Sequence, residues 1–415
     1  MRKEGAVMKK KWNRFLFILT ILGPGLITAN AGNDAGGVTT YSVIGAQYGY
    51  SMLWGLFAIG IGLAVIQEMN ARMAVVTGKG LSDLIRERYG VKLAFFAMFV
   101  LLIANVGVCI GDFAGIAASL ELFHVSKYFS IPIITFLIPF ILMKGDYSTA
   151  EKVFLGLTLT FFSYVITAFL VKPHWPEVFT SVVRPNANFT KDYSLALIGM
   201  VGTTITPYMQ FYLQSSIVDK GISLKDYKYE QLDVYLGTFW GVLTALFITV
   251  CTAETLHKFG ININTAQDAA LALKPLAGSY SFILFAVGLF GASFLACFVI
   301  PLSTSYAVCE AFGFESGLNN KIKEAPVFFG LFLFIIIVSA VIVLFPGISL
   351  IKIILVTQQL AGILCPVVLI FMINLVNDKE VMGEHTNNKL QNFISKTTVI
   401  LIIVLTIVTL VSSFI

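Results

Sequence analysis

Hydrophobic residues occur along this chain in long runs that are separated by short polar segments. Eleven runs approach or exceed the roughly 20 residues that an α-helix needs to cross the hydrocarbon core of a bilayer. The runs lie at about 15–47, 51–76, 93–120, 129–144, 153–172, 194–219, 234–257, 279–312, 326–345, 350–376 and 397–415. This pattern predicts an all-α polytopic membrane protein with 11 transmembrane helices.

Composition supports a membrane protein and limits its possible partners. The 415 residues are 57% hydrophobic and 12% charged, whereas soluble domains contain about 25% charged residues. The first run has no small-residue cleavage site and is interrupted by polar residues, so we do not expect a cleaved signal peptide. We expect a cytoplasmic segment at 1–14 and one transmembrane domain at 15–415.

Several partner classes find no support in the sequence. The net charge of +5 comes from basic residues in short loops, which does not indicate nucleic-acid binding. The chain has no nucleotide-binding motif, so we do not expect transport driven by ATP. The five cysteines lie apart in apolar runs without metal-ligand spacing. We therefore interpret them as small core residues and predict no cofactor.

Lysine and arginine residues predict the orientation in the membrane. Of the 28 such residues, 21 lie in the N-terminal segment and in the loops after the second, fourth, sixth, eighth and tenth runs. Because basic residues accumulate in cytoplasmic loops, the N-terminus is predicted to be cytoplasmic. With 11 spans, the C-terminus is then extracytoplasmic. The expected location is the plasma membrane.

The first hydrophobic run is interrupted at 32–37 by Gly-Asn-Asp-Ala-Gly-Gly and resumes at Val38. A charge such as Asp34 near the bilayer centre costs at least about 2.5–3.5 kcal/mol. Glycines also free backbone groups that lipid cannot satisfy. Transporters use such unwound segments at the midplane to coordinate cations. The alternative is a glycine-kinked helix whose Asp34 pairs with another helix.

A second interruption, Gly199–Tyr208, lies in the sixth run. Pro207 removes a backbone donor there and frees a carbonyl one turn earlier. Breaks at matching positions five helices apart are typical of inverted-repeat transporters. We expect repeat one at about 15–172 and repeat two at about 194–376, with an extra helix at about 397–415.

Five motifs suggest a family: GPGLITANAGNDAGG, GAQYGYSMLW, ARMAVVTGKGLSDLIRERYG, VGTTITPY followed by YLQSS, and NDKEVMGEHTN. The chain resembles the natural-resistance-associated macrophage protein (NRAMP) family of divalent-metal transporters from about residue 15 to 395. The resemblance is closest to the magnesium-transporter branch of that family. It implies a LeuT-like 5+5 inverted repeat with broken helices 1 and 6, alternating access, and a functional monomer.

The chain departs from the family at the positions that hold the metal. The family has Asp-Pro-Gly-Asn in its first helix, where this chain has Asp34-Ala35-Gly36-Gly37, so the carboxylate stays and the amide is lost. It has Met-Pro-His in its sixth helix, where this chain has Thr206-Pro207-Tyr208. A second family histidine corresponds to Gln214.

Two further positions concern the third and tenth helices. The third helix keeps Asp112, but the glutamate that transition-metal members have three positions later is Gly115 here. In the tenth helix, Gln358 stands eight residues before Pro366, where the family has a ligand glutamine.

The remaining donors predict the ion. A thioether favours Mn²⁺ and Fe²⁺ over hard ions, and its loss leaves oxygen donors that suit a largely hydrated Mg²⁺. Mn²⁺ should pass as well. We expect Asp34 to be the charged ligand, direct or through water. The resemblance implies carbonyl ligands at Ala31 and Thr203. We expect Thr206, Tyr208 and Gln358 to line the site and to bind hydration water, although Thr206 and Tyr208 could instead be packing groups. Gly37 and Gln214 are expected to lie nearby.

The four histidines bear on coupling to protons. Histidine suits proton transfer because its pKa is near 6.5, and the family uses histidines and acids near its metal site. Here all four lie in loops or at span ends: His124, His174, His257 and His385. We therefore expect import without tight proton coupling, since the membrane potential supplies about 2.3 kcal/mol per charge per 100 mV.

Other intramembrane charges have two interpretations each. Glu68 and Arg72 lie four residues apart, so they can form a structural ion pair on one helix face; alternatively, Glu68 lines the inner exit path. Asp112 could serve in a vestibule or proton relay, or form a structural hydrogen bond. Glu254 and Glu310 lie toward helix ends, where solvation is easier.

Three rival functions were considered. A proton-coupled Mn²⁺/Fe²⁺ symporter is disfavoured by Thr206, Tyr208 and Gly115. An amino-acid transporter on the same scaffold is disfavoured because Asp34 would repel a substrate carboxylate. An intramembrane protease would need two carboxylates about 3 Å apart, and its Gly-x-Gly-Asp pattern is broken before Asp112. We therefore do not expect an enzyme.

Overall fold

The computed structural model describes residues 32–143, 160, 162–186, 190–317 and 321–414. Its long helices are α4 (Leu53–Thr77), α5 (Leu81–Glu121), α6 (Lys127–Met143), α12 (Tyr227–Thr255), α15 (Ser281–Phe312), α16 (Pro326–Leu344), α17 (Leu350–Asn377) and α19 (Lys389–Phe414). The shorter ones are α3 (Ala35–Tyr48), α8 (Phe162–Leu170), α9 (Trp175–Val183), α10 (Lys191–Thr204), α11 (Pro207–Asp219), α13 (Ala266–Ala270), α14 (Lys274–Ala277) and α18 (Lys379–Met382). Within these ranges there is no β-strand, which confirms the all-α class.

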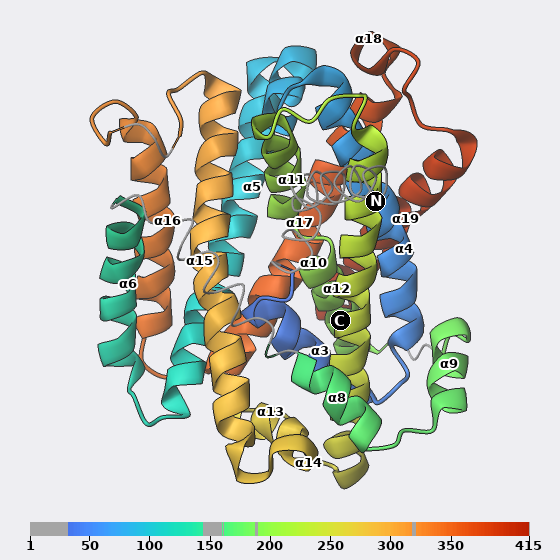
Figure 1. The fold of residues 1–415 in the computed structure, drawn as a ribbon, viewed down its shortest axis with the longest axis vertical. Coiled ribbons are helices and arrows are strands. Elements are labelled where there is room, and N and C mark those ends of the chain that lie inside the picture. The colour runs from blue at the N-terminus through green and yellow to red at the C-terminus, as the bar shows by residue number, and fades with distance from the viewer. Residues whose placement is uncertain (1–31, 144–159, 161, 187–189, 318–320, 415) are drawn as a thin grey trace, which may run out of the picture.

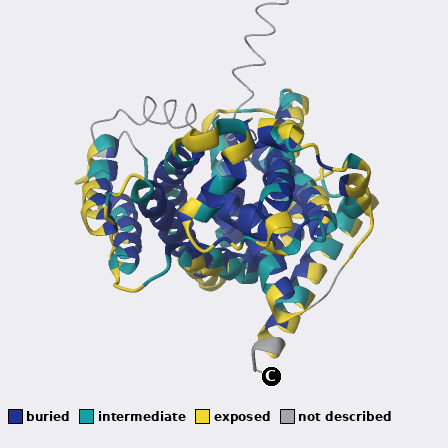
Figure 2. Cartoon of the chain, turned by 90° about the horizontal axis from the view of Figure 1, so that it is seen from below, coloured by how far each residue is buried: buried dark blue, intermediate teal, exposed yellow. Residues whose placement is uncertain are grey.

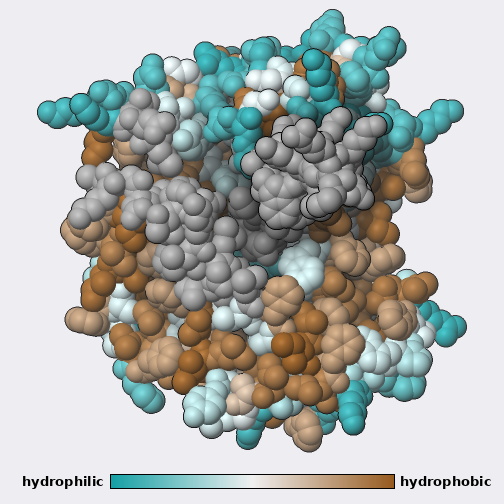
Figure 3. All heavy atoms as spheres, in the orientation of Figure 1, coloured by the Kyte–Doolittle hydropathy of each residue, from teal (hydrophilic) through white to brown (hydrophobic). Residues whose placement is uncertain are grey.

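The exterior of the molecule is that of a multi-pass membrane protein. Seven stretches of the described chain are long and apolar enough to cross a bilayer, and α6 is a shorter apolar helix. Figure 3 shows hydrophobic residues around the middle of the molecule and hydrophilic residues gathered mainly at its two ends. Large apolar side chains such as Phe95, Phe136 and Phe334 are exposed to the surroundings. An apolar surface of this extent indicates contact with lipid.

The helix bounds differ from the expected spans mainly at their polar ends. α5 begins at Leu81 rather than 93, because an extra helical segment precedes Gly90, whose φ of 77° bends the chain. Glycine adopts this angle without strain. α12 and α19 also begin seven to eight residues early. Parts of the first and fifth spans lie outside the described residues, so the number of 11 spans stays a prediction.

Helices from the two predicted repeats pack closely in the core. α5 packs against α15 and α17, and α10 crosses α17. At that crossing, a Cβ atom on Gly202 would lie 1.9 Å from the carbonyl oxygen of Gln358, and one on Gly362 would lie 2.3 Å from that of Ile198. Small residues allow helices to approach this closely inside membranes. The centre of the bundle is accordingly the most buried part of the chain (Figure 2).

Both interruptions end earlier along the chain than the sequence suggested. The expectation that Gly199–Tyr208 forms the second break is wrong in extent, because α10 continues to Thr204 and α11 begins at Pro207. Likewise the helix after the first break resumes at Ala35 rather than Val38. In each case a cap or a proline at the start of the next helix ends the break.

The two ends of the bundle are named here after their short helices (Figure 1). The α18 end carries α18, the start of α12 and the start of α19. The α13 end carries α13, the end of α3 and the start of α10. α9, an amphipathic helix that the sequence analysis did not expect, also lies toward the α13 end.

Candidate metal site at the two helix breaks

Asp34 forms the start of α3 and is almost completely buried. Its Oδ1 accepts a hydrogen bond of 2.9 Å from the backbone N–H of Gly37, so it acts as the N-cap of the helix. The partial positive charge of a helix N-terminus also favours a carboxylate there. A Cβ atom on Gly37 would lie 2.4 Å from the Gly32 carbonyl oxygen. The sequence therefore folds the break tightly around this carboxylate.

A second carboxylate, Asp112 of α5, reaches the same helix start. Its Oδ1 accepts a 3.3 Å hydrogen bond from the N–H of Ala35, one of the α3 donors without an intrahelical acceptor. Its Oδ2 is buried and has no hydrogen-bond partner in the described part of the chain. The structural hydrogen bond considered for Asp112 is thus present, and one oxygen atom remains available.

The second break leaves a carbonyl group without its usual helical donor. In a continuous helix the Thr203 carbonyl would accept from residue 207, but Pro207 has no N–H. The Thr206 hydroxyl donates to that carbonyl instead, at 3.3 Å. The Thr203 hydroxyl is buried without a partner among the described residues. A Cβ atom on Gly37 would lie 3.3 Å from this hydroxyl, so the two breaks lie next to each other.

Gln358 of α17 also lies at the breaks, together with Asp34, Asp112 and Thr203; these four residues form the group at the breaks. A Cβ atom on Gly36 would lie only 1.9 Å from the Gln358 Nε2, so this side chain rests directly against the first turn of α3. Both its Oε1 and its Nε2 are buried, and neither has a hydrogen-bond partner within the described ranges. Leaving such atoms unpaired costs about 1–3 kcal/mol each, which is typical of a site that binds something.

Tyr208 and Thr206 lie at the start of α11 and are buried. The backbone carbonyl of Tyr208 accepts a 3.3 Å hydrogen bond from the Ser303 hydroxyl of α15. Thr206 is the N-cap residue of α11 in position, although its side chain caps no backbone donor. Both residues therefore border the second break as expected.

The chain is similar to known proteins over almost its whole length. Residues 25–412 match the natural resistance-associated macrophage protein-like family. The chain belongs to this family. It is 25% identical to the divalent metal cation transporter MntH of Chromohalobacter salexigens, over 98% of this chain and 93% of that protein. It is 26% identical to MntH of Erwinia tasmaniensis, over 93% and 92%.

Solved structures confirm the fold of this NRAMP-like chain. A crystal structure of the Eremococcus coleocola manganese transporter, bound to an aromatic bis-isothiourea compound, aligns with a TM-score of 0.74 at 16% identity. That alignment covers 95% of this chain and 87% of the other. Mhp1, a nucleobase-cation-symport-1 family transporter, aligns with a TM-score of 0.54 at 13% identity, over 94% and 92%. The predicted inverted-repeat transporter fold is thereby confirmed.

Two residues named from the sequence, Gln214 and Glu68, are not part of this group. Ala31 lies outside the described residues. Gln214 is buried two turns further along α11, where its Nε2 donates to the Lys79 carbonyl at 2.9 Å. Glu68 pairs with Arg72 toward the α18 end, with Nε and Oε1 3.1 Å apart. Gln214 thus connects α11 to the loop after α4, and Glu68 belongs to an ion pair within α4.

The packing around Gly115 leaves no room for an acidic side chain at this position of the third helix. A Cβ atom there would lie 2.3 Å from the Ala35 Cβ and 2.6 Å from the Ser293 hydroxyl. α5 approaches α3 and α15 so closely that a glutamate cannot be accommodated. All four histidines are described and exposed, at the ends of helices or in loops.

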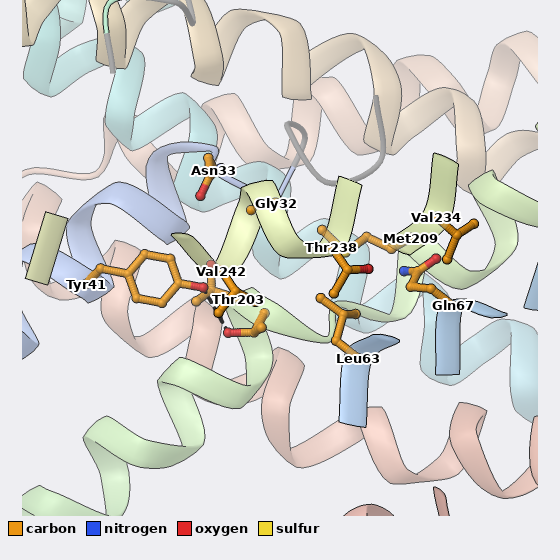
Figure 4. Close-up of a pocket in the computed structure, with 12 residues that line it drawn as sticks. Gly32, Asn33, Tyr41, Leu63, Gln67, Thr203, Met209, Val234, Thr238 and Val242 are labelled. Atoms are coloured by element: carbon orange, nitrogen blue, oxygen red, sulfur yellow. Dashed lines mark hydrogen bonds between the residues drawn. The ribbon is translucent and has the colours of Figure 1, made fainter. Parts of the chain in front are cut away.

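A small cavity beside the breaks was not predicted from the sequence. It has a volume of about 30 Å³, enough for about one water molecule. Figure 4 shows Asn33, Thr203, Gln67 and Thr238 around it. The Gln67 Oε1 is buried and unpaired among the described residues. A glutamine within the apolar α4 helix was the signal that could have identified it.

Proposed function

We propose that the protein imports divalent metal ions, Mg²⁺ and also Mn²⁺, by alternating access. The observation that supports this most directly is the set of unpaired oxygen and nitrogen atoms that converge between the two breaks, from Asp112, Thr203 and Gln358. Asp34 lies among them and supplies negative charge. Carboxylate, carbonyl, hydroxyl and amide oxygens are the ligands that Mg²⁺ and Mn²⁺ accept.

A hydrated ion fits this set better than a dehydrated one. Mg²⁺ gives up water reluctantly and binds proteins through one or two carboxylates while it keeps several waters. Water bound to the ion can in turn donate to the Gln358 Oε1 and the Asp112 Oδ2. The hydroxyl of Thr203 and the side chains of Thr206 and Tyr208 would take part in the same hydration shell.

Transport without tight proton coupling is part of the proposal. Two observations support it: Gly115 has no room for the acid of the transition-metal members, and the four histidines are far along the chain from either break. A divalent ion gains about 4.6 kcal/mol per 100 mV on entering a negative interior, so uptake needs no second substrate. The metal is substrate here, and no resident cofactor is proposed.

Orientation and assembly complete the proposal. The distribution of basic residues supports a cytoplasmic α18 end and N-terminus and an extracytoplasmic C-terminus, in the plasma membrane. The family resemblance favours a monomer.

A manganese symporter is the second candidate. The similar proteins are named a divalent metal cation transporter and a manganese transporter, and Mn²⁺ is also at ease with oxygen ligands. This candidate requires groups other than histidine to move the proton.

The test is metal influx into proteoliposomes that contain an interior pH dye. Mg²⁺ and Mn²⁺ are offered separately to the intact protein and to Asp34→Ala. We expect entry of both ions without acidification, and loss of both in the variant. Mn²⁺ entry that acidifies the interior, with no Mg²⁺ entry, would establish the manganese symporter instead.

A further inference from the structure

A second, larger cavity lies between α3, α10 and α17. Its volume is about 370 Å³. Among the residues that line it are Thr40, Gln47, Asp192, Gly199, Leu355 and Gln359. Gln47 and Asp192 are exposed at its mouth, where α3 ends and α10 begins. The cavity therefore opens toward the α13 end of the bundle.

The floor of this cavity, which is its end nearest the centre of the bundle, lies next to the breaks. Gly199 stands one helical turn, about 6 Å, before Thr203 on α10. Gln359 is the neighbour of Gln358 on α17. A Cβ atom on Gly199 would lie 3.6 Å from the Gln359 Cγ and 3.8 Å from the Thr40 Cγ2, so these three residues meet at the floor. A ligand in this cavity is therefore within about one helical turn of the metal site.

The chemistry of the lining suits a cation that keeps its water. Asp192 is the only charged residue among the described ones that line the cavity. The Thr40 hydroxyl is buried there without a partner in the described part of the chain. Each water occupies about 30 Å³, so 370 Å³ holds roughly a dozen waters, or a cation with its first shell and part of the second.

We propose that this cavity is the entry vestibule for the hydrated divalent cation, and that Asp192 attracts the cation to it by charge. The inference rests on the proposed function and extends it to a site that the breaks do not include. Thr40 and Gln359 would hold the ion through its water before it reaches Asp34.

Asp192 could instead serve only its own helix, because it lies in the first turn of α10, where a carboxylate offsets the helix dipole. Glu177 provides a matched control. It lies in the first turn of α9, the helix that precedes α10, and is exposed. It does not line the cavity. Glu177→Gln removes the same charge near the same end of the bundle.

The experiment compares Asp192→Asn with Glu177→Gln in proteoliposomes, at low ionic strength and at high ionic strength. Attraction between one charge and a divalent ion about 7 Å apart predicts that Asp192→Asn raises the KM for Mg²⁺ about three- to eight-fold at low ionic strength. Screening should reduce this to less than about two-fold in 0.5 M salt. The maximal rate should stay unchanged, and Glu177→Gln should leave both values unchanged.

An unchanged KM in Asp192→Asn, or an equal change in Glu177→Gln, would overturn the vestibule while leaving the transport function intact. If the intact protein moves only Mn²⁺, the same comparison is made with Mn²⁺. An intact protein that moves neither ion overturns the proposed function and the vestibule together. Thermal unfolding of both variants shows whether either substitution merely destabilises its helix.

Discussion

Two groups of buried polar residues in this protein differ in how their side chains are paired. Toward the α18 end, Glu68 accepts from the Tyr227 hydroxyl, from Arg72 and from the Gln391 side chain. Arg72 in turn donates to the His385 carbonyl at 2.9 Å. At the helix breaks, by contrast, atoms of Asp112, Thr203 and Gln358 have no partner among the described residues.

This difference indicates which buried polar groups stabilise the fold and which ones are available to bind the transported ion. Buried groups that pair with one another, as these do, stabilise contacts between elements, here α4, α12, α19 and the segment before α19. Unpaired buried groups destabilise the fold unless a ligand satisfies them. The first region should therefore respond to mutation in stability, and the second in transport.

The largest effect on stability is expected from Glu68→Ala. It leaves the buried guanidinium of Arg72 without its carboxylate, and breaking a buried pair in this way costs about 3–5 kcal/mol. Thermal unfolding in detergent should show a large fall in Tm. Lys79→Ala is the control, because its ion pair with Glu87 is exposed and such pairs contribute about 0–1 kcal/mol. Equal shifts in Tm for the two variants would contradict a structural role for the Glu68 network.

Asp34→Asn should affect transport rather than folding. The amide keeps an oxygen that can accept from the Gly37 N–H, so the cap of α3 is retained. The charge that attracts the metal is lost, and we expect influx to fall at least about 100-fold, which corresponds to about 2.7 kcal/mol. Metal influx and Tm are measured on the same preparation. A variant that transports normally would remove Asp34 from the site.

Gly115→Ala tests the close packing that excludes an acid from the third helix. The added methyl group would meet the Ala35 Cβ at 2.3 Å, and overpacking of this kind costs about 1–3 kcal/mol. Gly330→Ala on α16 is the matched control, since nothing lies within 4 Å of its Cβ position. We expect Tm to fall in the first variant and to stay or rise in the second. A Gly115→Ala protein with unchanged Tm would show that α5 has room for a side chain.

Features set by local sequence could be predicted, because hydropathy and backbone chemistry act over a few residues. The apolar runs define the spans, and Pro207 marks the second break because it lacks an N–H. Asp34 could be identified because a carboxylate among glycines is unfavourable in lipid. The α9 helix was missed because it is short and amphipathic, unlike a membrane span.

Contacts between distant segments could not be predicted in this way. Asp112 accepts a hydrogen bond from a backbone N–H 77 residues away in the sequence. Whether Asp112 has a structural role or a relay role depends on that contact. The exclusion of a side chain at Gly115 depends on how closely three helices approach each other. The vestibule likewise forms only when α3, α10 and α17 come together.

Gln358→Leu should have the smallest effect on stability. It should also distinguish most clearly between the region that stabilises the fold and the region that binds the ion. Leucine has a similar volume and removes two buried atoms that lack partners, so the free energy of unfolding without metal should rise by up to about 1 kcal/mol. Transport should fall about 10-fold, because the hydrated ion loses an amide partner. Tm is measured with and without Mg²⁺, and we expect the stabilisation by Mg²⁺ to shrink. A loss of Tm with transport unchanged would mean that Gln358 is a packing residue, and that unpaired atoms at the breaks do not mark the metal site.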